Sequence, residues 1–290
     1  MKEKTDHPLH QEIAKIAVLS PNASRLLEIN SKPDHSLNDI IQLVKFDAAL
    51  TAKTLRIVNS AAFNLLQPIN SIDRAISFLG ERMIVGMVIA ESAGEVFQKG
   101  LPGYESYPGD LWRHDLFTAF ASREVAKYAK EELEKELAFT AGLLHDIGKF
   151  VISSHLEGTA EKAVKVIDSG EASDYLNAEV QFSGHHHAEL GFELAKHWKL
   201  PEAIQEVIRY HHEPSKALEC YKPLVYAVHL GDILAMMSGH ATGSDALQYH
   251  LDGAYEDYYV ISPVELTKII ADTETQFRPA LTSLDNSQEN

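Results

Sequence analysis

The sequence predicts an all-α protein, a multi-helix bundle, and three observations support this fold class. Apolar residues recur three and four positions apart in one segment after another, which places them on one face of a helix. No alternation of apolar and polar residues is sustained long enough to indicate a strand. With 45% hydrophobic and 23% charged residues among 290, the chain has the composition of a globular protein with a sizeable buried core.

The first hundred residues are expected to form short helices separated by breaks that contain proline. Ser71 is suited to the N-cap of a helix over residues 72–79, which Gly80 would end. A helix over residues 83–97 is apolar on most faces, so we expect it at the centre of this lobe. We expect Asn59 to end a helix through local hydrogen bonds rather than to bind a ligand.

A stretch rich in Gly, Pro, Tyr and Ser at residues 99–109 indicates a loop and predicts a domain boundary. The chain is therefore expected to contain an N-terminal helical lobe (1–108), a second helical domain (109–245) and a C-terminal helical extension (246–290) with a frayed end. The long helices expected in the second domain cover residues 111–128, 133–154, 159–168, 187–198, 201–210 and 223–237.

Charge and cysteine content limit the function classes. The formal net charge of −16, from 42 acidic and 26 basic residues, argues against binding to nucleic acids or anionic membranes, because both require Lys and Arg to neutralise phosphates. A single cysteine, Cys220, excludes an intramolecular disulfide and fits a reducing compartment. There is neither an apolar signal-like segment nor an apolar run of ~18 residues, so we expect a cytoplasmic protein.

The feature that indicates chemistry is a His beside an Asp, His145 and Asp146, within an apolar stretch over residues 141–150. Polar groups near a core need partners, and a metal ion suits an imidazole and a carboxylate together. Further candidates come from separate expected helices, so a bundle can bring them together. They are His114, His187, His211, His212 and Asp232. Five imidazoles and two carboxylates, without a thiolate, suit one or two divalent ions of Fe, Mn, Zn, Ni or Co.

These positions resemble the pattern of the HD superfamily of metal-dependent phosphohydrolases: a His, a His-Asp pair and a distant Asp. The corresponding residues are His114, His145, Asp146 and Asp232. The remaining three histidines of the set fall where the HD-GYP branch has additional ligands. The resemblance implies that Asp146 bridges two ions, that a bridging water is the nucleophile, and that Lys149 lies near a bound phosphate. Alternatively, Lys149 is only a positive charge near a helix C-terminus.

The first lobe narrows the resemblance to the HDOD family. The matching segments are residues 45–53, 55–61, 69–72, 75–76, 79–80, 187–191 and 198–201, and the similarity spans roughly residues 12–239. It implies a bacterial, all-helical signalling or regulatory protein with the N-terminal lobe packed on the HD-type domain and available to signalling partners. After His212 the chain continues Glu213-Pro214-Ser215-Lys216, without the Asp-Gly-x-Gly-Tyr-Pro loop of the HD-GYP phosphodiesterases.

Three functions remain open at this point. One is a signal-transduction protein that is also a metal-dependent phosphohydrolase, with Asp146 and Lys149 as catalytic residues and a phosphate-containing small molecule as substrate. The second is a non-catalytic protein-interaction module, which the resemblance to the HDOD family favours, whereas retention of the full ligand set favours an enzyme. The third is a cyclic-dinucleotide phosphodiesterase without the GYP loop. Five further histidines are expected at the surface or in hydrogen bonds: His155, His185, His186, His197 and His229.

Overall fold

The computed structural model describes residues 100–285 without interruption and, before them, 13, 25–26, 29, 36–46, 51–52, 54–55, 58–59, 65, 67–80 and 83–86. These residues confirm the all-α prediction, since they contain helices and turns and no strand. Their single β-type contact is an isolated antiparallel bridge between Ala129 and Tyr259. Within the described residues, every helix is too short or too polar to cross a bilayer.

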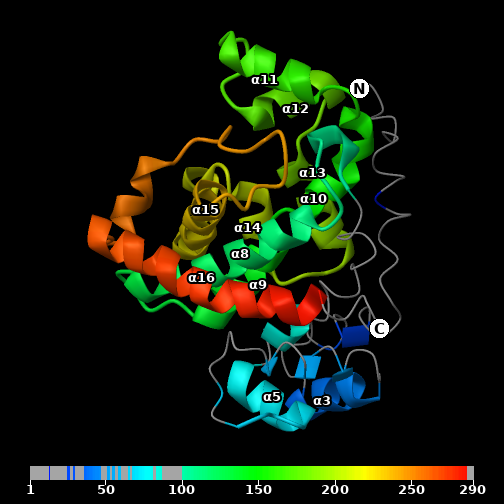
Figure 1. The fold of residues 1–290 in the computed structure, drawn as a ribbon, viewed down its shortest axis with the longest axis vertical. Helices are drawn as coiled ribbons and strands as arrows, with labels where there is room; N and C mark the ends of the chain where they lie inside the picture. Colours follow the sequence, from blue (N-terminus) through cyan, green and yellow to red (C-terminus); the bar gives the residue numbers. More distant parts are fainter. Residues whose placement is uncertain are drawn as a thin grey trace.

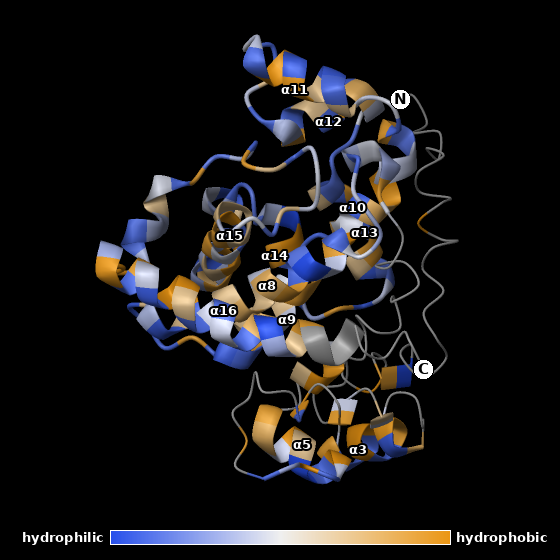
Figure 2. Ribbon diagram, in the orientation of Figure 1, coloured by the Kyte–Doolittle hydropathy of each residue, from blue (hydrophilic) through white to orange (hydrophobic). Residues whose placement is uncertain are grey.

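Two long helices, α8 (Asp110–Val125) and α15 (Lys222–Met237), pack against each other at the centre of the helices that follow residue 109 (Figure 1). Both are buried on most faces, which explains why their sequences show little polar patterning. Around them lie α9 (Lys135–Leu144), α10 (Ile147–Ile152), α13 (His187–His197), α14 (Glu202–Tyr210) and α16 (Pro263–Asp285). The last of these packs along α8, and it alternates hydrophilic and hydrophobic residues as a half-solvated helix does (Figure 2).

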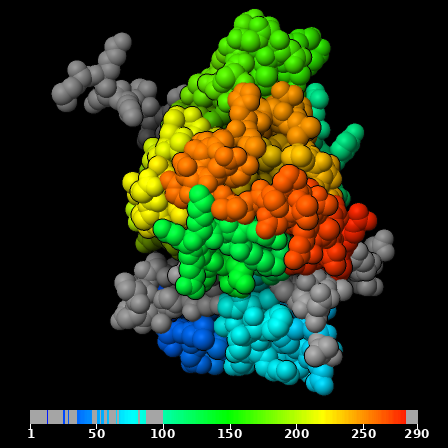
Figure 3. All heavy atoms as spheres, turned by 90° about the vertical axis from the view of Figure 1, so that its left-hand side faces the viewer, coloured from blue at the N-terminus to red at the C-terminus, as the bar shows by residue number. Residues whose placement is uncertain are grey.

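Two shorter helices, α11 (Ala160–Asp168) and α12 (Tyr175–Ser183), project from one end of the domain (Figures 1 and 3). Helix α12 is absent from the predicted set, although its sequence carries both terminal signals. Asp174 accepts a hydrogen bond from the Asn177 amide at the start, and Gly184 ends the helix with φ of 83°. Short 3₁₀ helices connect the longer ones: η2 (Pro102–Tyr104), η3 (Ala126–Tyr128), η4 (Ser153–Leu156), η5 (Pro214–Lys216), η6 (Glu219–Tyr221) and η7 (Gly253–Asp257).

Glycines set the close helix crossings that position the site. A Cβ on Gly148 of α10 would lie 1.8 Å from the backbone oxygen of His187, so α10 and α13 approach here only because the side chain is missing. A Cβ on Gly231 of α15 would lie 2.4 Å from the Ser122 hydroxyl of α8, and α9 meets the same part of α8 through Gly142. These contacts hold α8, α9, α10, α13 and α15 close together near the candidate ligands.

One expected helix, over residues 133–154, is divided in the structure. Helix α9 ends at Leu144 and α10 begins at Ile147, with Asp146 in a non-helical conformation (φ −100°, ψ 13°) between them. The apolar pattern runs through this break unchanged, which is why the sequence predicts continuity. The break directs the His145 and Asp146 side chains toward the same point.

The described part of the first lobe contains α3 (Leu37–Lys45) packed on α5 (Ile72–Leu79). The predicted cap is confirmed: the Ser71 hydroxyl accepts from the Arg74 amide, and Gly80 ends α5 with φ of 82°. Asn59 is also structural, because its side-chain amide donates to the Leu55 and Ile69 carbonyls and accepts from the Ile69 amide. Of the expected helix 83–97, residues 83–86 are helical and the rest lie outside the described residues, as do 286–290 of the predicted frayed end.

Candidate metal centre

All seven predicted ligands lie together in the second domain. Helix α8 supplies His114, the break before α10 supplies His145 and Asp146, and the first residue of α13 is His187. His211 and His212 follow the last residue of α14, and Asp232 lies in the middle of α15. Their side chains are at most 5% exposed. The structure thus brings together the whole predicted set, while coordination of a metal by these residues stays a prediction.

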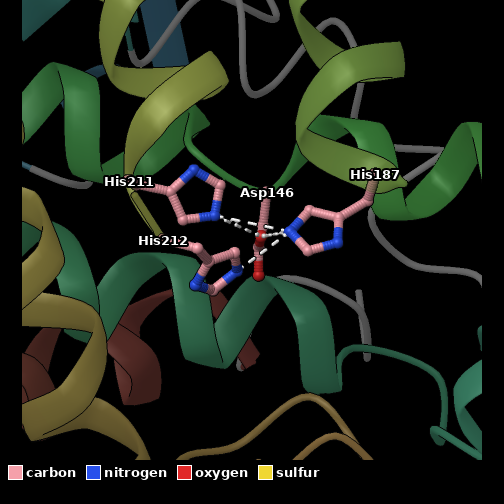
Figure 4. A group of neighbouring side chains, drawn as sticks. All are labelled: Asp146, His187, His211 and His212. Atoms are coloured by element: carbon pink, nitrogen blue, oxygen red, sulfur yellow. Dashed lines mark hydrogen bonds and ion pairs between the residues drawn. The ribbon is translucent and has the colours of Figure 1, made fainter. Parts of the chain in front are cut away.

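Asp146 lies at the centre, with one carboxylate oxygen toward each of two histidine groups. Its Oδ1 is 3.3 Å from His187 Nε2 and 3.4 Å from His211 Nε2 (Figure 4). Its Oδ2 is 3.4 Å from His114 Nε2 and 3.5 Å from His145 Nε2. A single carboxylate therefore contacts both groups.

Asp232 and His212 complete the two groups. Oδ1 of Asp232 is 3.1 Å from His114 Nε2, and its Oδ2 is 3.7 Å from His212 Nδ1. Nε2 of His212 lies 3.0 Å from His187 Nε2, beside Asp146 (Figure 4). We name the first group the His114 group (His114, His145, Asp146, Asp232) and the second the His187 group (Asp146, His187, His211, His212).

The outer nitrogens of the histidines fix which ring atom faces the centre. Nδ1 of His114 donates to the His240 carbonyl at 2.7 Å, Nδ1 of His145 to Gly142 O at 2.8 Å, and Nδ1 of His211 to Ile208 O at 3.0 Å. Because a carbonyl oxygen only accepts, the proton of each neutral ring is on Nδ1 and the Nε2 lone pair points inward. This is the orientation that metal-bound histidines have.

Inward-facing ring nitrogens and carboxylate oxygens make the centre fit a cation. His114 Nε2, His145 Nε2 and both oxygens of Asp146 are buried and make no hydrogen bond of good geometry. Without a bound ion, protons on the rings and the Lys149 ammonium group have to balance the carboxylate charge in this dry environment. Candidate ligand atoms lie within 4.8 Å of one another in two clusters: Asp146, His187, His211, His212; and His114, Asp115, His145, Asp146. Buried His and Asp side chains at both clusters could thus hold metal ions.

The electrostatics differ between the two groups. Burial lowers the pKa of His114, but its close contacts with the Asp146 and Asp232 carboxylates outweigh this effect and hold the pKa well above its usual value. In the His187 group, burial lowers the pKa of His211 to about 4, and burial together with His211 and His187 lowers that of His212. At neutral pH the latter two rings are neutral, the form that binds metals.

A buried carboxylate that the sequence did not single out orients His187. Glu179 Oε2 accepts hydrogen bonds from the His187 amide at 2.8 Å and from its Nδ1 at 2.9 Å. Its Oε1 accepts from the Tyr104 hydroxyl at 2.6 Å. Such carboxylates behind a histidine fix the ring and increase its basicity as a ligand. The sequence does not distinguish a buried glutamate such as Glu179 from a solvated one. Glu179 also lies on α12, a helix that was not predicted, so nothing in the sequence indicated this contact.

Asp115, next to His114 on α8, is a second acid that the sequence did not single out. Its side chain is fully buried, and both oxygens lack a hydrogen-bond partner. Burial raises its pKa to about 8, against the opposing charge of His145, whose Nδ1 lies 3.6 Å away. It is therefore protonated at neutral pH in the absence of further positive charge.

Lys149 lies beside the centre and is 2% exposed. Its ammonium group contacts Asp146 Oδ2 at 2.6 Å and Asp245 Oδ2 at 2.5 Å, and donates to Thr242 Oγ1 at 3.3 Å. These partners, rather than the helix terminus, determine its environment. Neither Asp245 nor Thr242 was predicted.

Two histidines outside the predicted set, His229 and His186, make hydrogen bonds that stabilise the fold. His229 is buried, donates from Nδ1 to the His211 carbonyl at 2.7 Å and accepts at Nε2 from the Asp252 amide at 2.9 Å, which confirms it as a hydrogen-bonded histidine. His186 caps α13 by accepting from the Glu189 amide. His185 and His186 are partly buried, and both make hydrogen bonds, His185 with the Glu189 carboxylate and His186 with the Glu189 amide.

Comparison with known proteins identifies the class. The HDOD domain matches residues 16–214, more than half of the chain, and the protein therefore belongs to the HDOD family. A protein of Treponema pallidum (strain Nichols) without a described function is 30% identical over 208 residues, which is 71% of this chain. The chain spans 40% of that relative's length.

Solved structures show the same fold. An HDOD domain protein of unknown function from Geobacter sulfurreducens has a TM-score of 0.62 at 23% identity, with 93% of this chain and 89% of that chain covered. A provisionally assigned phosphohydrolase from Shewanella amazonensis SB2B has a TM-score of 0.68 at 22% identity, with 96% and 98% covered. A provisionally assigned signal transduction protein from Marinobacter aquaeolei VT8 has a TM-score of 0.69 at 18% identity, with 97% and 67% covered.

Proposed function

We propose that this HDOD protein is a signal-transduction protein whose second domain binds two divalent metal ions and hydrolyses a phosphoester. The observation that carries the proposal is the position of Asp146, whose two oxygens each face a separate group of inward-pointing imidazole nitrogens. One ion would be held by the His114 group and the other by the His187 group, with Asp146 shared. Imidazole and carboxylate ligands suit Fe, Mn, Zn, Ni or Co.

When bound, such ions supply a lowered water pKa and polarise a phosphoryl oxygen. The chain's own residues do the rest. Backbone carbonyls and Glu179 hold the rings with Nε2 inward, so little reorganisation is needed for binding. Burial of the set excludes bulk water and strengthens each charge interaction. We assign to Lys149 the binding of a substrate phosphate. To bind phosphate, Lys149 has to give up its contact with the Asp245 carboxylate.

A non-catalytic interaction module is the second candidate, and one observation favours it. Lys149, the residue proposed to bind phosphate, is buried and already held within the protein: it donates hydrogen bonds to Asp245 and Thr242 and forms an ion pair with Asp146. In this alternative the metal centre is structural, and the N-terminal lobe (1–108) docks signalling partners. In both alternatives, residues 109–245 form the HD-type domain and residues 246–290 form the C-terminal helical extension. The cyclic-dinucleotide alternative has less support. The HD-GYP phosphodiesterases have an Asp-Gly-x-Gly-Tyr-Pro loop after the position of His212, whereas this chain has the short helix η5 there.

The decisive experiment combines metal content with hydrolysis of a generic phosphodiester. The purified full chain, loaded with Mn²⁺ or Fe²⁺, is expected to retain about two equivalents and to hydrolyse bis(4-nitrophenyl) phosphate. Asp146→Ala is expected to lose both, since both groups share this carboxylate. Asp168→Asn, on the exposed end of α11, is the control and should retain both. Metal-loaded protein without hydrolysis would select the non-catalytic alternative, and folded protein that binds no metal would refute both.

A further inference from the structure

The chain that follows α15 returns over the metal centre. We call residues 240–252 the cover segment. Its beginning is attached through the His240 carbonyl, which accepts from His114 Nδ1 at 2.7 Å. The Tyr249 ring stacks on His212 with 3.8 Å between ring centroids and 13° between planes, and the Asp252 amide donates to His229. The connection between α15 and α16 that contains this segment crosses the bundle in Figure 1 and forms part of the face in Figure 3.

The cover segment provides both hydrogen-bond acceptors of Lys149 that the structure shows. The ammonium group donates to Asp245 Oδ2 and to Thr242 Oγ1. Its third close polar neighbour is Asp146, whose Oδ2 lies 2.6 Å away in an ion pair. The Tyr104 and Tyr249 rings also lie 5.6 Å from the ammonium nitrogen, which leaves it surrounded by the protein. An incoming anion therefore has to replace one of these partners.

Hydrogen bonds within the cover segment hold the Asp245 carboxylate beside Lys149. Its Oδ1 accepts from the Gly243 amide at 3.1 Å and its Oδ2 from the Tyr249 hydroxyl at 3.2 Å. A Cβ on Gly243 would lie 2.1 Å from the Tyr104 carbonyl, so this approach requires glycine. The Ser244 amide donates to the same carbonyl at 2.8 Å. The turn at residues 243–245 therefore packs against Tyr104 and holds the Asp245 carboxylate next to Lys149.

The same segment carries a local strain that favours its release. Leu247 has φ of 56°, the left-handed region that residues with a Cβ rarely adopt, and its side chain is 63% exposed. Leu251 is also exposed, so the outer side of the cover segment makes few apolar contacts that would be lost on opening. Two further hydrogen bonds join the segment to the chain at the start of α12: the Gln248 carbonyl accepts from the Tyr175 amide at 3.1 Å, and His250 Nε2 donates to the Ser173 carbonyl at 2.7 Å.

We propose that Asp245 is an autoinhibitory residue: its carboxylate occupies the position of a ligand's phosphate beside Lys149, so that phosphate binding requires the cover segment to move. A carboxylate and a phosphate oxygen make the same charge-assisted contact with an ammonium group. The apparent affinity for phosphate is consequently reduced by the small fraction of molecules in which the segment is open. This inference rests on the proposed function, because it assigns regulation to the same centre.

The test measures binding of inorganic phosphate to the Mn²⁺-loaded full chain by calorimetry. Asp245→Asn removes the competing charge and is expected to tighten phosphate binding by about tenfold or more, since each 1.4 kcal/mol of lost competition is a factor of ten. Tyr249→Phe keeps the charge but removes one hydrogen bond to Asp245, and should give a smaller gain in the same direction. Asp168→Asn makes the same charge change on the exposed end of α11 and should leave the affinity unchanged.

Hydrogen exchange of residues 240–252 provides the second readout. In wild-type protein these amides are expected to be protected and to lose protection at saturating phosphate. Unchanged affinity in Asp245→Asn, or phosphate binding with the segment still protected, would overturn the inference even if metal is bound and phosphodiester is cleaved. Protein that fails to bind Mn²⁺ would instead refute the proposed function, so the two failures are distinguishable.

Discussion

The metal-facing side and the anion-facing side of the centre are built differently. On the metal-facing side, helices hold the rings, and several buried nitrogen and oxygen atoms have no hydrogen-bond partner. On the anion-facing side, Lys149 is enclosed by Asp146, Asp245 and Thr242, and the last two belong to the cover segment. A centre can therefore keep all its candidate ligands and still be closed to substrate. Ligand retention alone does not distinguish an enzyme from a signalling module.

Removing Lys149 tests the anion-facing side and is expected to have the largest effect on stability. Lys149→Met would leave Asp245 buried without its charge partner, which typically costs about 3–5 kcal/mol. The free energy of unfolding of metal-free protein, measured by urea denaturation, should fall by that amount. Adding Asp245→Asn should recover a large part of the loss, because the uncompensated charge is then gone. Equal destabilisation in the double variant would mean that the pair is not coupled.

Removing one ligand tests the metal-facing side. His211→Ala is expected to lose one of two bound ions and to weaken Mn²⁺ binding by about 100-fold or more, because even changes behind a ligand cost about 10–100-fold. Calorimetric titration with Mn²⁺ measures both the number of sites and the affinity. His197→Ala, an exposed histidine on α13, is the control. Two undiminished sites in His211→Ala would remove this residue from the centre.

Glu179 should matter less than a ligand and more than a surface acid. Glu179→Gln keeps the size of the side chain but weakens the hydrogen bond to His187 Nδ1, so Mn²⁺ affinity at one site should fall about 10-fold to 100-fold. Glu179→Asp retains the charge and is expected to recover part of that loss. If both variants bind Mn²⁺ like the wild type, the carboxylate has only a structural role.

The two histidine groups should respond differently to pH. Burial lowers the pKa values of His114 and His145, but the nearby carboxylates have the larger, opposite effect, so both pKa values are raised. A metal ion must therefore displace protons from these two rings. Affinity at the His114 group should rise by about tenfold per pH unit for each proton displaced, and level off above these pKa values. His211 and His212 have lowered pKa values, so they impose no such dependence near neutral pH. Mn²⁺ titrations between about pH 6 and 8 measure both slopes, and identical slopes would contradict this assignment.

The sequence predicted the centre better than its surroundings. His114, His145, Asp146 and Asp232 were found because their types and order match a known pattern, and glycine-mediated helix crossings then place them together. The break between α9 and α10 escaped detection, since apolar residues continue through it. Glu179 and Asp245 could not be found, because a buried acid and a solvated acid look alike in sequence. What distinguishes them is a partner far along the chain: Asp245 lies 96 residues from Lys149.

Whether two metal ions share Asp146 can be seen by anomalous diffraction from crystals of the Mn²⁺-loaded full chain. We expect two manganese peaks, one at the His114 group and one at the His187 group, with Asp146 contacting both. A single peak that Asp146 does not contact, or fully metal-free rings in crystals grown with excess Mn²⁺, would contradict this expectation.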